Sequence, residues 1–133
     1  MLDDVAEVFA RTPLIADLAP GGRYLAVDVF GIGGTDAVLK ALLDGGYLHG
    51  DALTLSGQTL AEHLADHAGP DGEVVRPTSR AISPTGGVIV LRGSLAPDGA
   101  LIKVAGLKTL TFEGRARVFD SEEVCFAAVQ ERD

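Results

Sequence analysis

The hydrophobic pattern of the chain changes its period near the middle. In the first part, for example over residues 2–10, apolar side chains recur every three or four positions, as on one face of a helix. Beyond residue 85 they alternate with a period of two, as in a strand. Residues 69–85 lie between these parts and are rich in Gly, Pro, Ser, Asp and Arg. The pattern predicts an α/β part followed by a β-rich part, joined by a linker.

The first part is predicted to hold three helices and one strand. Thr59 and Glu62 stand in the T-x-x-E spacing of a capping box, which marks the start of a helix. A proline at position 13 and the pair Gly45-Gly46 mark helix ends. The predicted elements are a helix over residues 2–10, a strand over 24–29, a helix over 35–43 with Thr35 as its N-cap, and a helix over 60–67.

The second part is predicted to consist of short strands separated by turns. Pro97-Asp98-Gly99 and Gly114 are turn signals within the alternating pattern. Asp120 precedes an apolar stretch and is expected to cap a helix that runs through Val129. The predicted strands cover residues 88–91, 100–104, 110–112 and 116–119.

Composition and charge exclude several classes of protein. Hydrophobic residues make up 47% of the 133 residues and charged residues 23%, which is typical of a folded domain and not of a disordered tail. The net charge of −8 would repel a phosphate backbone, so we expect no nucleic-acid partner. The longest apolar run, residues 124–129, is far too short to cross a membrane. The mean hydropathy of +0.25 predicts apolar surface that meets another subunit or domain, and we expect a homo-oligomer.

The cellular compartment is predicted from the cysteine count and the first turn. The chain has one cysteine, which cannot form an internal disulfide, so a reducing compartment is the simplest interpretation. Asp3, Asp4 and Glu7 stand where a secretory or mitochondrial leader would carry basic residues. We therefore expect a cytoplasmic protein.

The glycine-rich segment Gly31-Ile32-Gly33-Gly34 is a candidate anion site. Unpaired amide groups and the helix dipole can both favour a phosphate or carboxylate at the start of a helix. The segment matches neither the dinucleotide-binding motif G-x-G-x-x-G nor the P-loop. A plain backbone turn is the favoured interpretation.

Three histidines, His49, His63 and His67, are candidate metal ligands or proton-transfer groups. His63 and His67 lie one helical turn apart, a spacing that can place two imidazoles on one metal ion. The sequence between them is not the H-E-x-x-H motif, and no third ligand is indicated, so a solvated helix face is favoured and no metal site is predicted. His49 is expected to be a loop residue and not a general base.

The remaining reactive side chains favour structural roles. Cys125 has apolar neighbours and no basic residue beside it, so an inert thiol in the core is favoured over a reactive one. Asp120, Glu122 and Glu123 could bind a cation, but at a helix start they are expected to cap the helix. No nucleophile is predicted among the hydroxyls Ser83, Thr85 and Ser94. Accordingly, no residue of this chain is predicted to be catalytic, and no substrate contact is named.

Four segments, taken in order, resemble the dihydroxy-acid and 6-phosphogluconate dehydratase family. They are TPLIADLAPGGRYLAVDVFGIGG (residues 12–34), AVLKALLDGGYLHGDALTLSGQTLAEHL (37–64), ISPTGGVIVLRGSLAPDGALIKVAG (82–106) and FEGRARVFDSEE (112–123). The sequence departs from the family at Ser94, at Arg115 and at Arg80-Ala81, where members often carry Asn, Pro and Asn-Pro. These departures leave the substrate branch open between a branched dihydroxy acid and a sugar acid.

The resemblance implies a hydro-lyase that converts a 2,3-dihydroxy acid, a small molecule, into a 2-keto acid. It implies an iron–sulfur cluster and Mg²⁺ in the full enzyme, with the cluster cysteines, magnesium ligands and serine base outside this chain, so that neither cofactor is expected to bind the chain alone. Residues 1–68 would be the end of the α/β N-terminal domain and residues 69–85 the linker. Residues 86–133 would be the first strands and helix of a β-barrel-like, swivelling C-terminal domain.

Two other interpretations remain open on the sequence alone. One is a stand-alone, non-catalytic β-rich domain or truncated product that self-associates. The other is a small anion-binding module that uses residues 31–34.

Overall fold

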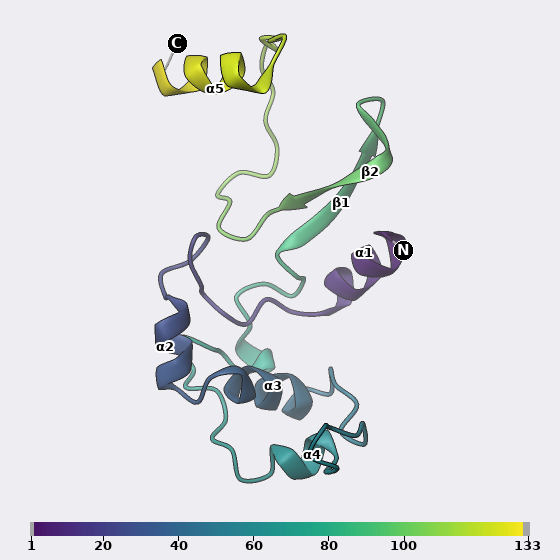
Figure 1. Cartoon of the computed structure of the whole chain (residues 1–133), viewed down its shortest axis with the longest axis vertical. Coiled ribbons are helices and arrows are strands. Elements are labelled where there is room, and N and C mark those ends of the chain that lie inside the picture. Colours follow the sequence, from purple (N-terminus) through teal and green to yellow (C-terminus); the bar gives the residue numbers. More distant parts are fainter. Residues whose placement is uncertain (1, 132–133) are drawn as a thin grey trace.

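The chain forms a small helical part, a β-hairpin and a separate terminal helix. The computed structural model describes residues 2–131, and Figure 1 shows α2, α3 and α4 at one end, the hairpin beside α1, and α5 at the other end. The elements are α1 (Leu2–Arg11), α2 (Ala26–Gly31), α3 (Thr35–Asp44), α4 (Leu60–His63), the 3₁₀ helix η1 (Thr78–Arg80), β1 (Val88–Gly93), β2 (Ala96–Lys103) and α5 (Glu122–Glu131). The fold is mixed α/β, as predicted.

Helix α1 confirms the helix predicted at the start of the chain. Asp3 and Asp4 lie in its first turn and Arg11 in its last, where their charges interact favourably with the helix dipole. The helix packs beside β1, and Gly86 N donates a hydrogen bond to Phe9 O at 2.7 Å. α1 therefore lies beside the hairpin, away from α3 and α4 (Figure 1).

The strand predicted over residues 24–29 is wrong, because this segment forms α2. The carboxylate of Asp28 accepts a hydrogen bond from Leu25 N at 2.7 Å and closes the first turn of the helix. Leu25 and Val27, whose alternation suggested the strand, are 57% and 66% exposed. A strand here would need a partner along its length, and the structure provides only one isolated bridge, between Leu18 and Tyr24.

Helix α3 confirms the predicted helix, with its start shifted by one residue. Its N-cap is Gly34 and not Thr35, and the φ angle of Gly34 is +69°, which favours glycine. Gly45 follows the last helical residue, as predicted. Ala37 and Ala41 are buried on the inner face of the helix.

The capping box at α4 is confirmed, but the helix is shorter than predicted. Glu62 N donates to Thr59 Oγ1 at 3.2 Å, and Thr59 N donates to the Glu62 carboxylate at 2.8 Å. The pKa of Glu62 is lowered mainly by the hydrogen bond from Thr59 N, and further by the Thr59 hydroxyl, which donates to the same carboxylate at 2.9 Å. Beyond His63 the chain continues in turns, in which His67 N bonds to Leu64 O at 3.2 Å. This is the tighter i to i−3 pattern that often ends a helix.

Residues 69–85 contribute two of the few buried side chains. Val74 and Val75 pack with Ile15 and Ala41 in the core cluster. Their backbone also pairs with the first part, through isolated bridges such as the one between Ala16 and Val75. The segment therefore crosses the core of the first part, and its role as a domain linker stays a prediction.

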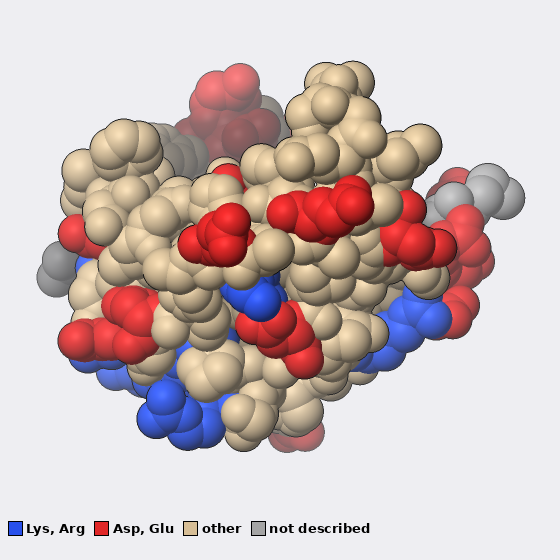
Figure 2. All heavy atoms as spheres, turned by 90° about the horizontal axis from the view of Figure 1, so that it is seen from below, with Lys and Arg blue, Asp and Glu red and all other residues tan. Residues whose placement is uncertain are grey.

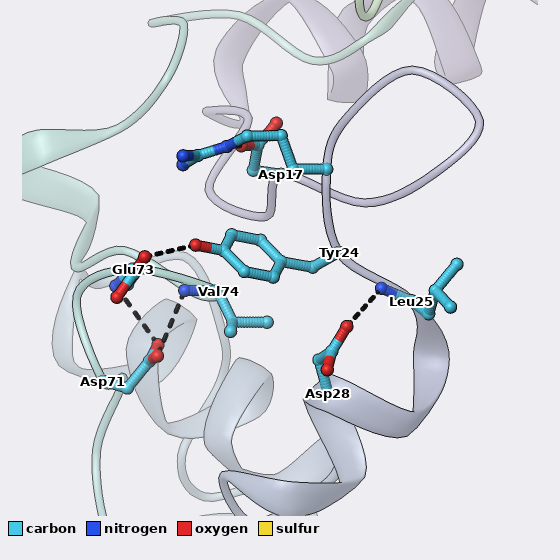
Figure 3. A network of polar contacts seen from close by, with 8 residues as sticks. Asp17, Tyr24, Leu25, Asp28, Asp71, Glu73 and Val74 are labelled. Atoms are coloured by element: carbon cyan, nitrogen blue, oxygen red, sulfur yellow. Dashed lines mark hydrogen bonds and ion pairs between the residues drawn. The ribbon is translucent and has the colours of Figure 1, made fainter.

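A polar network holds this crossing segment in place (Figure 3). The Asp71 carboxylate accepts hydrogen bonds from the amides of Glu73, Val74 and Val75, at 2.9 to 3.3 Å. Glu73 in turn accepts a hydrogen bond from the Tyr24 hydroxyl, which lies just before α2. Burial raises the pKa of Asp71, but the backbone amides outweigh it and lower the pKa below its usual value.

Asp71→Ala should destabilise the chain by about 1–2 kcal/mol, because three amides lose their acceptor. Since the pKa of Asp71 is lowered in the folded state, its contribution is present above the ordinary aspartate pKa of ~3.9 and is lost as the pH falls below it. Urea unfolding between pH 3 and pH 7 measures both effects. Asp66→Ala, in an exposed turn, is the control. Equal losses in the two variants would contradict the prediction.

The hairpin of β1 and β2 turns earlier than predicted. Gly93 pairs with Ala96, so Ser94 and Leu95 form the turn. The predicted turn Pro97-Asp98-Gly99 lies inside β2, where the register shifts opposite Arg92. Its turn-forming residues therefore make a bulge in the strand, a role that proline and glycine also serve.

The strands predicted over residues 110–112 and 116–119 are wrong for the part of the chain that the structure describes. Both segments are irregular, and Phe112 and Val118 are 91% and 86% exposed. Strand backbone needs a partner for its hydrogen bonds, and neither segment has one here. The β-rich part is thus a single two-stranded antiparallel sheet within residues 2–131.

Helix α5 begins after Ser121. The Ser121 hydroxyl accepts a hydrogen bond from Val124 N at 3.3 Å, so Ser121 takes the capping role that was predicted for Asp120. Figure 1 shows α5 at the end of an irregular segment, apart from the hairpin. None of the helices within residues 2–131 has the length and apolar character that a membrane crossing requires.

Candidate functional site

The glycine-rich segment before α3 is a closed turn. Ile32 N and Gly34 N donate to Val29 O, and Gly33 N donates to Phe30 O, at 2.8 to 3.2 Å. These amides, which an anion would need, already complete the last turn of α2. The geometry favours the plain backbone turn. An open hollow beside it is lined by Leu18, Ala26, Val29, Phe30 and residues 33–36.

His63 and His67 meet a third group that the sequence did not indicate. His63 Nε2 lies 3.3 Å from Asp36 Oδ2, and His67 Nε2 lies 3.4 Å from the same oxygen. The three ligand atoms all lie within 4.8 Å of one another. The two imidazole rings are tilted by 37° with their centroids 5.3 Å apart. Asp36 and the two histidines therefore form a compact cluster, called the His-Asp cluster below.

The His-Asp cluster joins the start of α3 to the end of α4. Asp36 lies in the first turn of α3, directly before Ala37, which is fully buried. His63 directly precedes Leu64, which is also fully buried. No local signal marks Asp36 as a partner of two histidines about thirty positions away, since only the packing of the two helices brings them together.

His49 lies apart from this cluster, in a loop. Its carbonyl accepts a hydrogen bond from Ala52 N at 3.2 Å, in a turn after α3. The side chain lines a surface hollow together with residues of α1 and the loop after α3, among them Arg11 and Tyr47. The position agrees with the loop role expected for it.

The hydroxyl and carboxylate candidates take part in local turns. The Ser83 hydroxyl accepts a hydrogen bond from Thr85 N at 3.3 Å, which is a turn within one loop. A hydrogen bond from its own backbone amide and one from the Ser121 side chain lower the pKa of Glu123. Glu123 is thus a helix-capping carboxylate in α5, as the sequence favoured.

Comparison with known proteins assigns the chain to a family. Residues 1–63 match the family described as "Dihydroxy-acid/6-phosphogluconate dehydratase N-terminal", and residues 73–133 match its C-terminal counterpart. The chain belongs to this family of dehydratases. The N-terminal and C-terminal family matches follow one another along the chain, and they confirm the resemblance that the four sequence segments indicated.

Curated dehydratases align with almost the whole chain. It is 66% identical over 128 residues to "Dihydroxy-acid dehydratase 2" of Bordetella bronchiseptica, and 59% identical over 134 residues to "Dihydroxy-acid dehydratase" of Parvibaculum lavamentivorans. It is also 52% identical over 132 residues to the Mycobacterium leprae protein of that name. These alignments cover 96–98% of this chain but only 22–23% of the relatives. The chain thus spans less than a quarter of their length.

This chain does not itself fit an iron–sulfur cluster. Such clusters are held by several cysteine thiolates, and Cys125 is the single cysteine of the sequence. Cys125 is partly buried in α5, between apolar neighbours. No residue of α5 is buried, so the core position predicted for this thiol is wrong.

Proposed function

We propose that this chain is a framework segment of an enzyme that removes water from a 2,3-dihydroxy acid and yields a 2-keto acid. The observation that carries the proposal is the near-complete alignment of the chain with less than a quarter of each dihydroxy-acid dehydratase. The proposed substrate class is the one that the names of these relatives state. The segment would position other parts of the enzyme and carry none of the reacting groups.

The exposed surface of the chain supports a framework role. Its accessible surface is 9948 Å², whereas a self-contained folded protein of 13.8 kDa exposes roughly 6,600 Å². Large apolar side chains lie on that surface, including Phe30, Phe112 and Phe126 at 81%, 91% and 63% exposure. Apolar surface of this extent usually belongs to an interface.

The arrangement of elements suggests where the missing parts would pack. Residues 1–68 would end the N-terminal α/β domain, residues 69–85 would cross between domains, and residues 86–133 would begin the C-terminal domain. β1 and β2 have one partner each, so both outer edges of the hairpin could pair with further strands. A β-barrel-like C-terminal domain would be completed in this way.

The cofactors of the whole enzyme are part of the proposal. An iron–sulfur cluster and Mg²⁺ would be held by residues outside this chain, because its single cysteine does not suffice for a cluster. When bound, such metals supply the positive charge that makes hydroxide a better leaving group. The proposed enzyme is a cytoplasmic homo-oligomer.

A chimeric enzyme tests the framework role. In this chimera, residues 1–133 replace the matching segment of the Bordetella bronchiseptica relative. Two properties are measured: the rate of keto-acid formation from a dihydroxy acid, and the iron and sulfide content of the purified protein. We expect activity within about tenfold of the parent, because substitutions away from special structural features usually change stability by less than about 0.5 kcal/mol. The 133-residue chain alone should form no keto acid.

The control is the same chimera with Val75→Asp, which places a charge at a fully buried position and should abolish folding. A folded chimera with the parent's iron content but no activity would contradict the framework role. Turnover by the chain alone would contradict the absence of reacting groups.

A further inference from the structure

We infer that the His-Asp cluster of Asp36, His63 and His67 is a binding site for a divalent transition-metal ion of the zinc type. The site would use one carboxylate oxygen and two imidazole Nε2 atoms, and would leave a fourth position for water. It lies in the helical part and is separate from the cofactors proposed for the whole enzyme, so this inference does not depend on the dehydratase activity.

The distances within the cluster fit metal coordination. Two ligand atoms held tetrahedrally at about 2.0–2.1 Å from one zinc ion lie about 3.3–3.4 Å apart. The distances from Asp36 Oδ2 to the two Nε2 atoms are 3.3 and 3.4 Å. Both exceed the roughly 2.7–3.2 Å usual for an N–H···O hydrogen bond. Two edges of the coordination tetrahedron are thus already formed.

The third edge requires only a side-chain adjustment. One nitrogen of each histidine and a carboxylate oxygen of Asp36 all lie within 4.8 Å of one another, so the two imidazole nitrogens need to approach by about 1.5 Å at most to share a tetrahedral ion. The His67 side chain is 40% exposed and lies in the turns after α4, where a rotation about its χ angles meets little resistance.

The backbone around the ligands is well fixed, which favours binding. Asp36 is adjacent to the fully buried Ala37, and His63 is adjacent to the fully buried Leu64. The capping box of Thr59 holds the start of α4. Little ordering of the backbone is therefore needed on binding, and such preorganisation increases affinity.

The donor set selects the class of ion. Two imidazoles and one carboxylate suit zinc, copper, nickel or cobalt, whereas Mg²⁺ prefers oxygen ligands in an octahedron. A bound ion would join α3 to α4 at a point where the structure otherwise has an exposed ion pair. The site is therefore inferred to stabilise the packing of these two helices.

Zinc titration of the chelator-treated, full 133-residue chain tests the inference, after circular dichroism has shown that the chain is folded. We expect one zinc per chain, competed by Co²⁺ with the visible absorption of tetrahedral cobalt but not by excess Mg²⁺. Asp36→Asn and His67→Ala should each weaken binding at least about tenfold, since each removes one of three protein ligands. His49→Ala, which changes the histidine outside the cluster, should leave affinity unchanged.

A second readout works equally on the chimeric enzyme. Carbethoxylation of histidines, located by mass spectrometry, should be slowed by zinc at His63 and His67 but not at His49. Protection in the chimera without keto-acid formation would support the metal site while contradicting the proposed function. Zinc binding that is insensitive to Asp36→Asn and His67→Ala, or absent from both folded proteins, would overturn the inference and leave only a surface ion pair.

Discussion

Gly106→Ala should destabilise the chain by about 3 kcal/mol or more, because the new methyl group would collide with backbone and not with a movable side chain. The φ angle of Gly106 is +83°, and a Cβ there would lie closer than 3.0 Å to the O, Cα and C atoms of Gly21. This contact joins the turn before α2 to the turn after β2. Globular domains are stable by only about 5–15 kcal/mol, so the loss would be a large fraction of the total.

Gly57→Ala is the matched control for this prediction. Gly57 has the same φ of +83°, but nothing lies within 4 Å of its would-be Cβ. The substitution should therefore cost only the backbone strain of about 1–2 kcal/mol. Urea unfolding of both variants, with amide exchange followed near Gly21 and Gly106, measures the difference. Equal losses at the two positions would show that the close approach of Gly21 and Gly106 does not hold in solution.

The sequence predicted elements whose signals are local. Helix α1 follows from its acidic first turn and apolar spacing, and the start of α4 follows from the Thr59 and Glu62 capping box. Helix α3 follows from its apolar stripe and from Gly45 after its end. In each case, the hydrogen bonds that decide the element are made within a few residues of it.

The errors arose where one local pattern fits two structures, or where a strand needs a partner that lies elsewhere. The alternating pattern over residues 24–29 is too short to distinguish a strand from a helix, and Asp28 decided it by capping α2. The strands predicted at 110–112 and 116–119 have no partner within the described chain, and alternation alone cannot supply one. The hairpin turn was misplaced because Pro97 and Gly99 serve a bulge as well as a turn.

The candidate metal site could be predicted only in part. The spacing of His63 and His67 drew attention to two possible ligands, but a solvated helix face was favoured and no metal site was predicted. The third, Asp36, is brought to them by the packing of α3 against the segment after α4, which no pattern in one sequence reveals. Sequence spacing therefore finds ligands within an element but not ligands that tertiary packing brings together.

The isolated chain should self-associate strongly, because its surface exceeds that of a self-contained protein by about 3,000 Å². This excess is larger than the total of about 1,200–2,000 Å² that a standard protein interface buries. Sedimentation velocity across a hundredfold dilution should show a shift from oligomers toward monomer, and a dye that binds apolar surface should fluoresce with the chain but much less with the chimeric enzyme.

Phe112→Asp combined with Val118→Asp should weaken this association at least tenfold, since both side chains are almost fully exposed in the irregular segment before α5. Leu55→Asp is the control, because Leu55 is also fully exposed but lies in the tight turn before α4. A monomer that is insensitive to dilution would mean that the exposed apolar side chains do not form an interface, and the framework role would lose its main physical support. Equal weakening by the control would mean that the added charge acts through general repulsion, so that the segment before α5 is not the contact surface.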